Sequence, residues 1–164
     1  VEAENALLDA GNTISLRLAT VFGPSPRMRF DLLVNDFVRR AVSDGILVVY
    51  EKDFKRNYVH IQDVADCFCF ALDHVDAMKG RPYNVGLNDA NLSKAELVQE
   101  IQRQIPALQV HFDEVGSDPD RRNYIISNAR INAAGFVAQV SLYEGIQQLI
   151  KTCRMIPAGD YSNA

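Results

Sequence analysis

The residues with the most evident chemical potential lie in a short basic segment that runs from Lys52 to Arg56. A guanidinium group can pair with two phosphate oxygens at once, and nearby lysines add positive charge around it. Arg56 is followed by Tyr58-Val59-His60-Ile61, and Asp63 then begins a predicted helix. The segment is therefore a candidate phosphate-binding site. On spacing alone, an ordinary surface arginine beside Lys52 and Lys55 is the simpler interpretation of Arg56.

Composition limits the classes of protein to which this chain can belong. It has 164 residues, of which 48% are hydrophobic and 23% are charged, as in a soluble globular domain. The net charge of -4 argues against nucleic-acid binding as a general property. The sequence contains no apolar run as long as a membrane span and no secretory signal at its start.

The chain has three cysteines, Cys67, Cys69 and Cys153. An odd number without C-x-x-C spacing argues against a disulfide framework and against a zinc site, so no metal ligands are predicted. Cys67 and Cys69 lie within an apolar helical stretch, and we expect them to act as small buried hydrophobic side chains. A reducing, cytoplasmic environment is the expected location.

Hydrophobic periodicity predicts strands that alternate with helices, which is typical of the α/β class. The predicted strands are residues 14–22, 46–50, 83–85, 109–112 and 124–126. Helices are predicted up to Ala10, from Asp31 to near Gly45, from Asp63, after the capping boxes at Ser93 and Ser141, and over 128–134. The helix from Asp63 carries its apolar side chains on one side, at Val64, Phe68, Ala71, Leu72 and Val75.

Three motifs follow one another along the chain: Arg17-Leu18-Ala19-Thr20-Val21-Phe22-Gly23-Pro24, then Arg56-Asn57-Tyr58-Val59-His60-Ile61-Gln62-Asp63-Val64-Ala65, then Tyr83-Asn84-Val85-Gly86. In this order and spacing they resemble the extended short-chain dehydrogenase/reductase family, the NAD-dependent nucleotide-sugar epimerases and dehydratases. The resemblance covers nearly the whole chain and corresponds to the second half of the family's usual sequence. It implies an incomplete Rossmann-type parallel sheet with a small α/β substrate-binding lobe.

The resemblance assigns roles to several residues in substrate binding. Arg56 matches the arginine of the family's Arg-Asp-Tyr-Val-His pattern, which contacts the substrate diphosphate, although Asn57 replaces the common aspartate. Thr20 falls where many relatives carry an asparagine that bonds near the sugar or its phosphate. Leu33 falls where backbone groups contact the nucleotide base, and a core leucine is its alternative interpretation.

A second phosphate-contact region of the family corresponds to residues 118–124. Ser117 stands where many relatives have an arginine, so Arg121 or Arg122 is expected to supply the charge, with Asp120 in the same segment. The alternative is a solvated loop. Two further residues, Ala19 and Val21, fall where the family's backbone passes the nicotinamide, and they are the candidate cofactor contacts.

The family's catalytic groups have no counterpart in this sequence. None of the nine glycines forms the Gly-rich turn that holds the cofactor pyrophosphate, and no tyrosine is followed by a lysine four residues later. No catalytic residue is therefore assigned. The stretch Val1-Glu2-Ala3-Glu4 resembles the family segment directly after the catalytic Tyr-x-x-x-Lys, so we expect the chain to start within the catalytic helix.

The resemblance implies a division of the chain into parts. Residues 1–23 and 56–86 would be a remnant of the dinucleotide-binding domain, residues 24–55 and 87–151 the substrate-binding lobe, and residues 152–164 a tail. Strands of the remnant would lack sheet partners, which favours association.

The expected function is the substrate-binding half of an NAD-dependent nucleotide-sugar epimerase or dehydratase, which oxidises a sugar carbon to a keto intermediate. NAD or NADP would serve the whole protein, and this chain alone is expected to be inactive and not to bind the cofactor. Its expected partners are a nucleotide-diphosphate sugar, the missing N-terminal half and further copies of itself, with neither nucleic acid nor membrane. Two alternatives stay open: a non-catalytic nucleotide-sugar binding or interaction module, and the substrate half of a nucleotide-sugar reductase.

Overall fold

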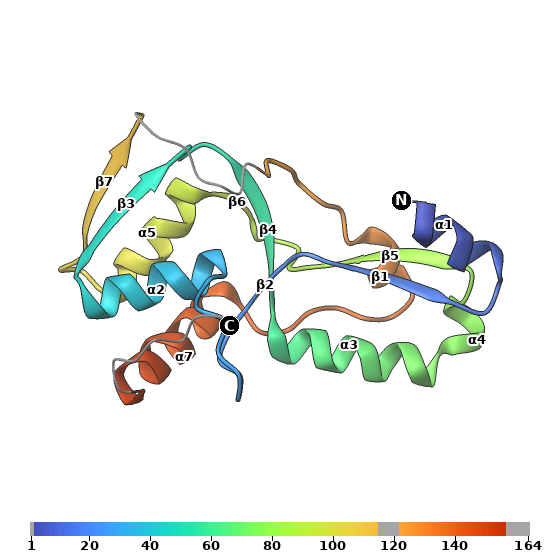
Figure 1. The fold of residues 1–164 in the computed structure, drawn as a ribbon. Helices are drawn as coiled ribbons and strands as arrows, with labels where there is room; N and C mark the ends of the chain where they lie inside the picture. Colours follow the sequence, from blue (N-terminus) through green and yellow to red (C-terminus); the bar gives the residue numbers. More distant parts are fainter. Residues whose placement is uncertain (1, 115–121, 157–164) are drawn as a thin grey trace.

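The computed structural model describes residues 2–114 and 122–156. Over these residues the chain forms two lobes at opposite ends of an elongated molecule, joined by strands in the middle (Figure 1). Strands alternate with helices, and most strand pairs are parallel. The predicted α/β class with a parallel sheet is confirmed. No helix in this part of the chain is both long and apolar enough to cross a membrane.

The first lobe is built on two parallel strands, β1 (Ile14–Leu18) and β5 (Arg81–Val85). Helices α3 (Ile61–Asp73) and α4 (Val75–Met78) precede β5 and pack against this pair. The N-terminal helix α1 (Glu2–Asp9) is attached to β1 through Glu4, which accepts hydrogen bonds from Arg17 and Ser15. Those hydrogen bonds, from Arg17 above all, lower the pKa of Glu4 to about 2. Helix α1 has no buried side chain, so the Glu4–Arg17 ion pair is what holds it to β1.

The second lobe contains the parallel pair β3 (Ile46–Tyr50) and β7 (Gln109–Asp113) with helices α2 (Leu33–Ser43), α5 (Lys94–Gln104) and α7 (Leu142–Met155). Both predicted capping boxes are present: Ser93 and Glu96 begin α5, and Ser141 and Glu144 begin α7. Each box satisfies backbone N–H groups that the first turn of a helix cannot pair. These two helix starts are therefore encoded by four consecutive residues each.

The two lobes meet at β4 (Lys55–His60), which pairs with β2 (Thr20–Phe22) in parallel and with β6 (Asn91–Ser93) in antiparallel. The predicted continuous strand 14–22 is divided at Ala19 into β1 and β2. Ala19 donates its N–H to Val85 of β5, whereas Thr20 is already registered with Tyr58 of β4. The chain therefore pairs with β5 up to Ala19 and with β4 from Thr20 onward.

Each lobe has its own hydrophobic core, and β4 contributes to both. Tyr58 packs in the cluster of the second lobe, and Val59 packs in the cluster of the first lobe. Successive side chains of a strand point to opposite faces, so neighbouring residues can serve different cores. The first-lobe cluster also includes Ile131 and Phe136 from the region of α6 (Ala129–Ala133).

The predicted strand 124–126 is wrong, although the segment lies along β4 and β6. Side-chain amides take the place of a backbone ladder there. Lys55 donates its N–H to Asn123 Oδ1 at 2.9 Å and accepts from the Tyr124 N–H at 2.9 Å. Asn91 bonds both backbone groups of Ile126, each at 3.0 Å. Sequence periodicity cannot show that asparagine side chains will complete a strand-like pairing.

Three helix boundaries also differ from the predictions. Helix α3 begins at Ile61 rather than Asp63, because the His60 Nδ1 atom accepts the Gln62 N–H at 3.2 Å and caps the helix. Helix α2 begins at Leu33 rather than Asp31, and the side chain of its N-cap residue, Leu32, makes no capping hydrogen bond. Helix α7 continues to Met155, through residues that the sequence analysis placed in a tail.

Candidate functional site

Strand β4 places the candidate site, because its alternation puts Arg56, Tyr58 and His60 on one face. Arg56 is 1% exposed and Tyr58 is fully buried. The interpretation of Arg56 as an ordinary surface arginine is therefore wrong. A buried guanidinium group is stable only when charged or polar groups surround it, and such positions are concentrated at ion pairs and binding sites.

Two further hydroxyl groups lie close to this face of β4. Thr20 is registered opposite Tyr58 across the β2–β4 pair. The Thr20 Oγ1 atom lies 3.5 Å from the Tyr124 hydroxyl. Tyr124 belongs to the segment 123–127, which the side chains of Asn123 and Asn91 hold beside β4 and β6. Arg56 and Tyr124 both act electrostatically on the Tyr58 phenol. A guanidinium group and three hydroxyl groups are thereby brought together from three separate parts of the chain.

The Tyr58 hydroxyl is buried and has no hydrogen-bond partner among the described residues. Burial raises the pKa of Tyr58, an effect that the Arg56 charge opposes and Tyr124 reinforces, so the phenol stays protonated. Leaving a buried donor unsatisfied costs about 1–3 kcal/mol, and such groups are rare in folded proteins. The Tyr58 O–H can therefore donate to an acceptor that enters the site.

Sequence reasoning missed Tyr58 and Tyr124 as members of this cluster. Tyr58 could have been found, because it stands two residues after Arg56 on a strand and so shares its face. No local signal identifies Tyr124, since its position depends on the side chains of Asn123 and Asn91.

The remaining sequence-predicted residues lie at varying distances from Arg56 along the fold. Ala19 is buried at the β1–β2 break and Val21 is half-buried in β2. Leu33 begins α2, half-buried against the second-lobe core. Asn35 holds this end of α2 to β2, since its Oδ1 atom accepts the Gly23 N–H at 3.1 Å. Arg122 is exposed, and Asp120 and Arg121 lie outside the described residues.

Asn57 points to the other face of β4 and is fully buried. Its Nδ2 atom donates to the Leu87 carbonyl at 2.8 Å and to Asn91 Oδ1 at 3.2 Å. Both partners are acceptors in this network, because Asn91 Nδ2 already donates to Ile126. The Asn57 amide nitrogen is therefore matched to two acceptors, which a carboxylate could not pair with, while Asn57 Oδ1 is buried without a hydrogen-bond partner among the described residues.

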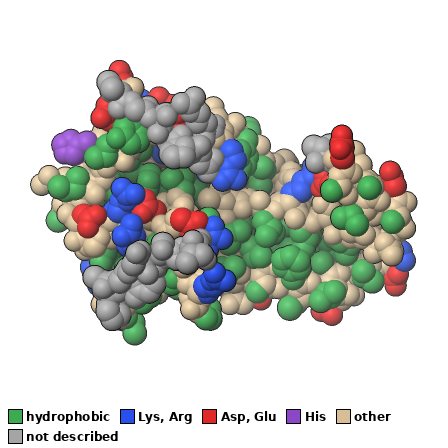
Figure 2. All heavy atoms as spheres, in the orientation of Figure 1, with side chains coloured by type: hydrophobic (Ala, Val, Ile, Leu, Met, Phe, Trp, Pro, Cys, Tyr) green, Lys and Arg blue, Asp and Glu red, His purple; other side chains and the backbone are tan. Residues whose placement is uncertain are grey.

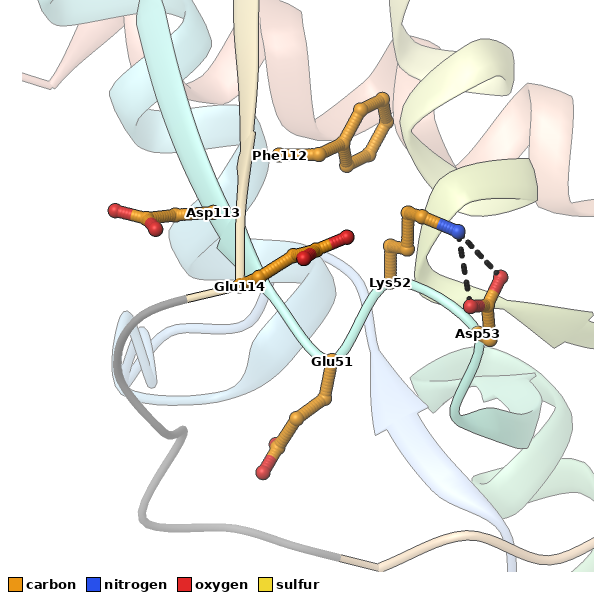
Figure 3. Close-up of a pocket in the computed structure, with 6 residues that line it drawn as sticks. All are labelled: Glu51, Lys52, Asp53, Phe112, Asp113 and Glu114. Atoms are coloured by element: carbon orange, nitrogen blue, oxygen red, sulfur yellow. Dashed lines mark hydrogen bonds and ion pairs between the residues drawn. The ribbon is translucent and has the colours of Figure 1, made fainter.

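A separate hollow of about 230 Å³ lies where β3 and β7 end, beside the basic segment (Figure 3). Its lining is mostly acidic: Glu51, Lys52, Asp53, Phe112, Asp113 and Glu114. Lys52 turns to Asp53, with its Nζ atom 2.9 Å from the carboxylate. The negative charge of this lining disfavours a phosphate group. The candidate phosphate site therefore stays at Arg56 on β4.

Residues 4–86 match the model of the NAD dependent epimerase/dehydratase family. The chain belongs to this family. The matched range includes β1, β2, β4 and β5, so it contains the strand that carries Arg56 and Tyr58.

Solved structures, two of them 4-epimerases, share the fold at low sequence identity. RMD from Pseudomonas aeruginosa, complexed with NADPH, superposes with a TM-score of 0.74 at 19% identity over 93% of this chain. UDP-glucose 4-epimerase from Thermus thermophilus, complexed with NAD, gives 0.70 at 21% identity over 93%. UDP-glucuronic acid 4-epimerase from Bacillus cereus, complexed with UDP-glucuronic acid and NAD, gives 0.73 at 17% identity over 88%.

This epimerase/dehydratase chain spans about half the length of those solved structures. The alignments cover 54% of the Pseudomonas chain, 50% of the Thermus chain and 46% of the Bacillus chain. The fold shared with them therefore includes the strands of both lobes, while a comparable length of each relative has no counterpart here.

The residues that the family resemblance assigns to NAD fit that cofactor in part. Ala19 is buried in the first-lobe core and Val21 packs against that core at the break between β1 and β2, so the backbone of this segment is the part that a nicotinamide could meet. The sequence has no Gly-rich turn to receive the pyrophosphate of the cofactor. These two residues could therefore line a nicotinamide but could not hold the dinucleotide by themselves.

Proposed function

We propose that this chain is the substrate-binding half of an NAD-dependent nucleotide-sugar epimerase or dehydratase. The observation that carries the proposal is a cluster of polar groups on β4: Arg56 is buried there beside Tyr58, and the Tyr58 hydroxyl has no hydrogen-bond partner among the described residues. The hydroxyl groups of Thr20 and Tyr124 lie close by. These groups would bind the diphosphate of a nucleotide sugar, and Leu33 at the start of α2 would contact the base.

A diphosphate suits this cluster better than a neutral ligand. Hydrogen bonds between a guanidinium group and phosphate oxygens are short, strong and often bidentate. A phosphate anion would also be attracted by the buried positive charge, because a protein interior screens charge less than water does. The protonated phenol of Tyr58 and the hydroxyl groups of Thr20 and Tyr124 can each donate to an oxygen. Because Arg56 is 1% exposed, a ligand reaches it only by displacing atoms that cover it.

The chemical step would need groups from an N-terminal half that corresponds to the unmatched length of the solved relatives. That half would supply the Gly-rich turn and the catalytic tyrosine and lysine. NAD or NADP would accept a hydride from a sugar carbon to give the keto intermediate. Within this chain, residues 1–23 and 56–86 would complete the nucleotide-binding sheet, and residues 24–55 and 87–151 would form the substrate lobe. The chain alone would bind substrate without turnover.

Two partners follow from this assignment. The free edge of β1, which pairs with β5 on one side among the described residues, would receive the sheet of the N-terminal half. Further copies of the chain would make a homo-oligomer. Arg121 or Arg122 would add a second positive charge near the substrate phosphates, with Asp120 in the same segment.

Isothermal titration with UDP-glucose tests the proposal. The wild-type chain should bind it, and Arg56→Lys should weaken binding by about 30-fold or more, since a lysine cannot pair bidentately. Arg103→Lys, on the exposed side of α5, is the matched control and should bind as the wild type does. Absence of UDP-glucose binding by the folded wild-type chain, or equal losses in both variants, would overturn the proposal.

A further inference from the structure

Arg56 is closed off from solvent in the structure, although it lies at the centre of the proposed phosphate site. Its exposed fraction is 1%, and the neighbouring Tyr58 is fully buried. A diphosphate cannot reach a group this deeply buried unless part of the chain moves away from it. Such movements occur by local opening of segments that bury little surface and leave the rest of the fold intact.

Tyr124 crosses the face of β4 that carries Arg56. Its N–H donates to the carbonyl of Lys55, the residue before Arg56, at 2.9 Å. Its hydroxyl lies 3.5 Å from Thr20 Oγ1, and Thr20 is registered opposite Tyr58. Side chains registered opposite one another lie on the same face of a sheet. The side chain of Tyr124 therefore extends along β4 between these two levels and passes Arg56, which lies between them.

The segment that carries Tyr124 is attached largely by asparagine side chains. Asn123 Oδ1 accepts a backbone N–H of β4 at 2.9 Å. Asn91 bonds both backbone groups of Ile126, each at 3.0 Å. Asn84 Nδ2 donates to the backbone carbonyl of residue 127 at 3.1 Å. Strands within a sheet are joined by a regular ladder of backbone bonds, whereas these side-chain bonds can break while the ladder of β2, β4 and β6 persists.

The segment 123–127 also buries little surface. None of its residues is fully buried, and Ile125 is 67% exposed. Ile126 is half-buried and packs against the first-lobe core. The next residue, Asn128, is 5% exposed and donates to Asn88 Oδ1 at 3.3 Å, so it fixes the end of the segment. Low burial next to a fixed end is expected of a segment that opens by itself.

We propose that the segment 123–127 is a strap that leaves β4 to admit the substrate diphosphate to Arg56, and that Asn91 determines how often the strap opens. The identity of the ligand rests on the proposed function, whereas the opening does not. When the strap closes again, the Tyr124 hydroxyl returns beside Thr20, where it can donate to a phosphate oxygen.

Asn91 connects the strap to the opposite face of β4. Its Oδ1 atom accepts from the Ile126 N–H and also from Asn57 Nδ2, at 3.2 Å, while its Nδ2 atom donates to the Ile126 carbonyl. Because Asn57 is fully buried, it holds the Asn91 amide in the one orientation that satisfies both groups of Ile126. The asparagine at position 57 therefore controls access to the site without touching the ligand.

Modification by phenylglyoxal, followed by mass spectrometry of peptides, tests the strap without any ligand. This reagent attacks accessible guanidinium groups, so Arg56 should react slowly and Arg103, with a side chain that is 67% exposed, should react quickly. Asn91→Ala should raise the Arg56 rate about 10-fold, because both of its bonds to the strap are lost. Asn132→Ala, which removes one hydrogen bond between asparagine side chains outside the strap, is the matched control and should react as the wild type does.

Urea separates opening of the strap from unfolding of the whole chain. Below the unfolding transition, the Arg56 rate should rise far less than the unfolded fraction, because opening the strap exposes little surface. An Arg56 rate that follows global unfolding, or equal rates in Asn91→Ala and Asn132→Ala, would overturn the proposal. Asn123→Ala, at an exposed position, repeats the test if Asn91→Ala does not fold, since it removes the tie to β4.

UDP-glucose distinguishes this proposal from the proposed function. Protection of Arg56 from phenylglyoxal by UDP-glucose supports both. Local opening in a chain that binds no UDP-glucose would contradict the proposed function and support the strap. Binding of UDP-glucose by a chain whose Arg56 reacts only through global unfolding would support the proposed function and contradict the strap.

Discussion

The two faces of β4 use buried polar side chains for different purposes. One face carries Arg56 and Tyr58, and the Tyr58 hydroxyl has no hydrogen-bond partner in the part of the chain that the structure describes. The other face carries Asn57, whose Nδ2 atom joins Leu87 and Asn91 and, through Asn91, the segment 123–127, while its Oδ1 atom is buried without a partner among the described residues. Alternation along one strand thus separates groups that could bind a ligand from groups that hold the surrounding chain in place.

This difference predicts opposite outcomes for substitutions on the two faces. Changes on the Asn57 face should lower the free energy of unfolding. Removal of the Tyr58 hydroxyl on the Arg56 face should lower ligand affinity while leaving stability nearly unchanged, as is common where binding groups are retained at a cost to the fold.

The largest stability effect is expected at Gly86, which lies against Asn57. A Cβ atom at this position would lie 1.9 Å from Asn57 Oδ1 and 2.9 Å from the Ile126 Cδ1 atom. Gly86→Ala should therefore lower the free energy of unfolding by about 3 kcal/mol in urea denaturation. Gly80→Ala is the control: it has a positive φ of 73° but open space around it, so about 1 kcal/mol is expected. Equal losses would show that the close approach is relieved by relaxation.

Asn57→Asp should cause the next largest loss in the free energy of unfolding, about 2 kcal/mol, because a buried carboxylate would face the Leu87 carbonyl and Asn91 Oδ1. Asn88→Asp is the control and should leave stability nearly unchanged, since a carboxylate oxygen can accept the same hydrogen bonds that Asn88 Oδ1 accepts from Asn128 and Asn132. Urea midpoints at neutral pH measure both variants. Full stability of Asn57→Asp would mean that the Asn91 amide reverses to donate.

Tyr58→Phe tests the opposite face. Its free energy of unfolding should be unchanged or higher, since the hydroxyl makes no hydrogen bond to any described residue. Its affinity for UDP-glucose should fall about 5-fold, the equivalent of one hydrogen bond worth about 1 kcal/mol. Tyr143→Phe, at an exposed position on α7, is the control for both measurements. A loss of stability without a loss of affinity would place Tyr58 among the structural groups.

The smallest expected effect is a pH dependence at His60. Burial lowers its pKa below 6.5, an effect that Asp63 and Gln148 partly offset, so the folded chain holds the ring neutral. As pH falls below about 6.5, the unfolded chain takes up the proton more readily, and stability is lost until the folded pKa is reached. Above that range the contribution is constant.

His60→Asn keeps a side chain that can cap α3 but removes the titration. The difference in urea midpoint between pH 7.5 and pH 5.5 should therefore be smaller in this variant than in the wild type. An identical difference in both proteins would assign the acid sensitivity to other groups.

Local sequence signals predicted much of the fold because the interactions behind them are local. The boxes Ser93–Glu96 and Ser141–Glu144 close within four residues, so the starts of α5 and α7 could be predicted correctly. The strand 124–126 could not, because the hydrogen bonds of that segment come from distant asparagine side chains. The side of α3 that faces solvent could not be predicted either, since apolar residues stand both on its buried face, at Val64, Cys67 and Ala71, and on its exposed face, at Phe68 and Leu72. Figure 2 shows hydrophobic side chains at the surface over the region of α3.

The amino-acid sequence alone specifies the α/β class, the family motifs and the residue types available for binding phosphate. Which of those residues meet is a property of the folded chain. Thr20 and Tyr124 are 104 residues apart in sequence, yet their hydroxyl groups lie 3.5 Å apart. Arg56 stands among lysines in the sequence, and its burial follows from the packing of β4 between two lobes. Burial and long-range contacts depend on how elements pack, which no local pattern of residues records.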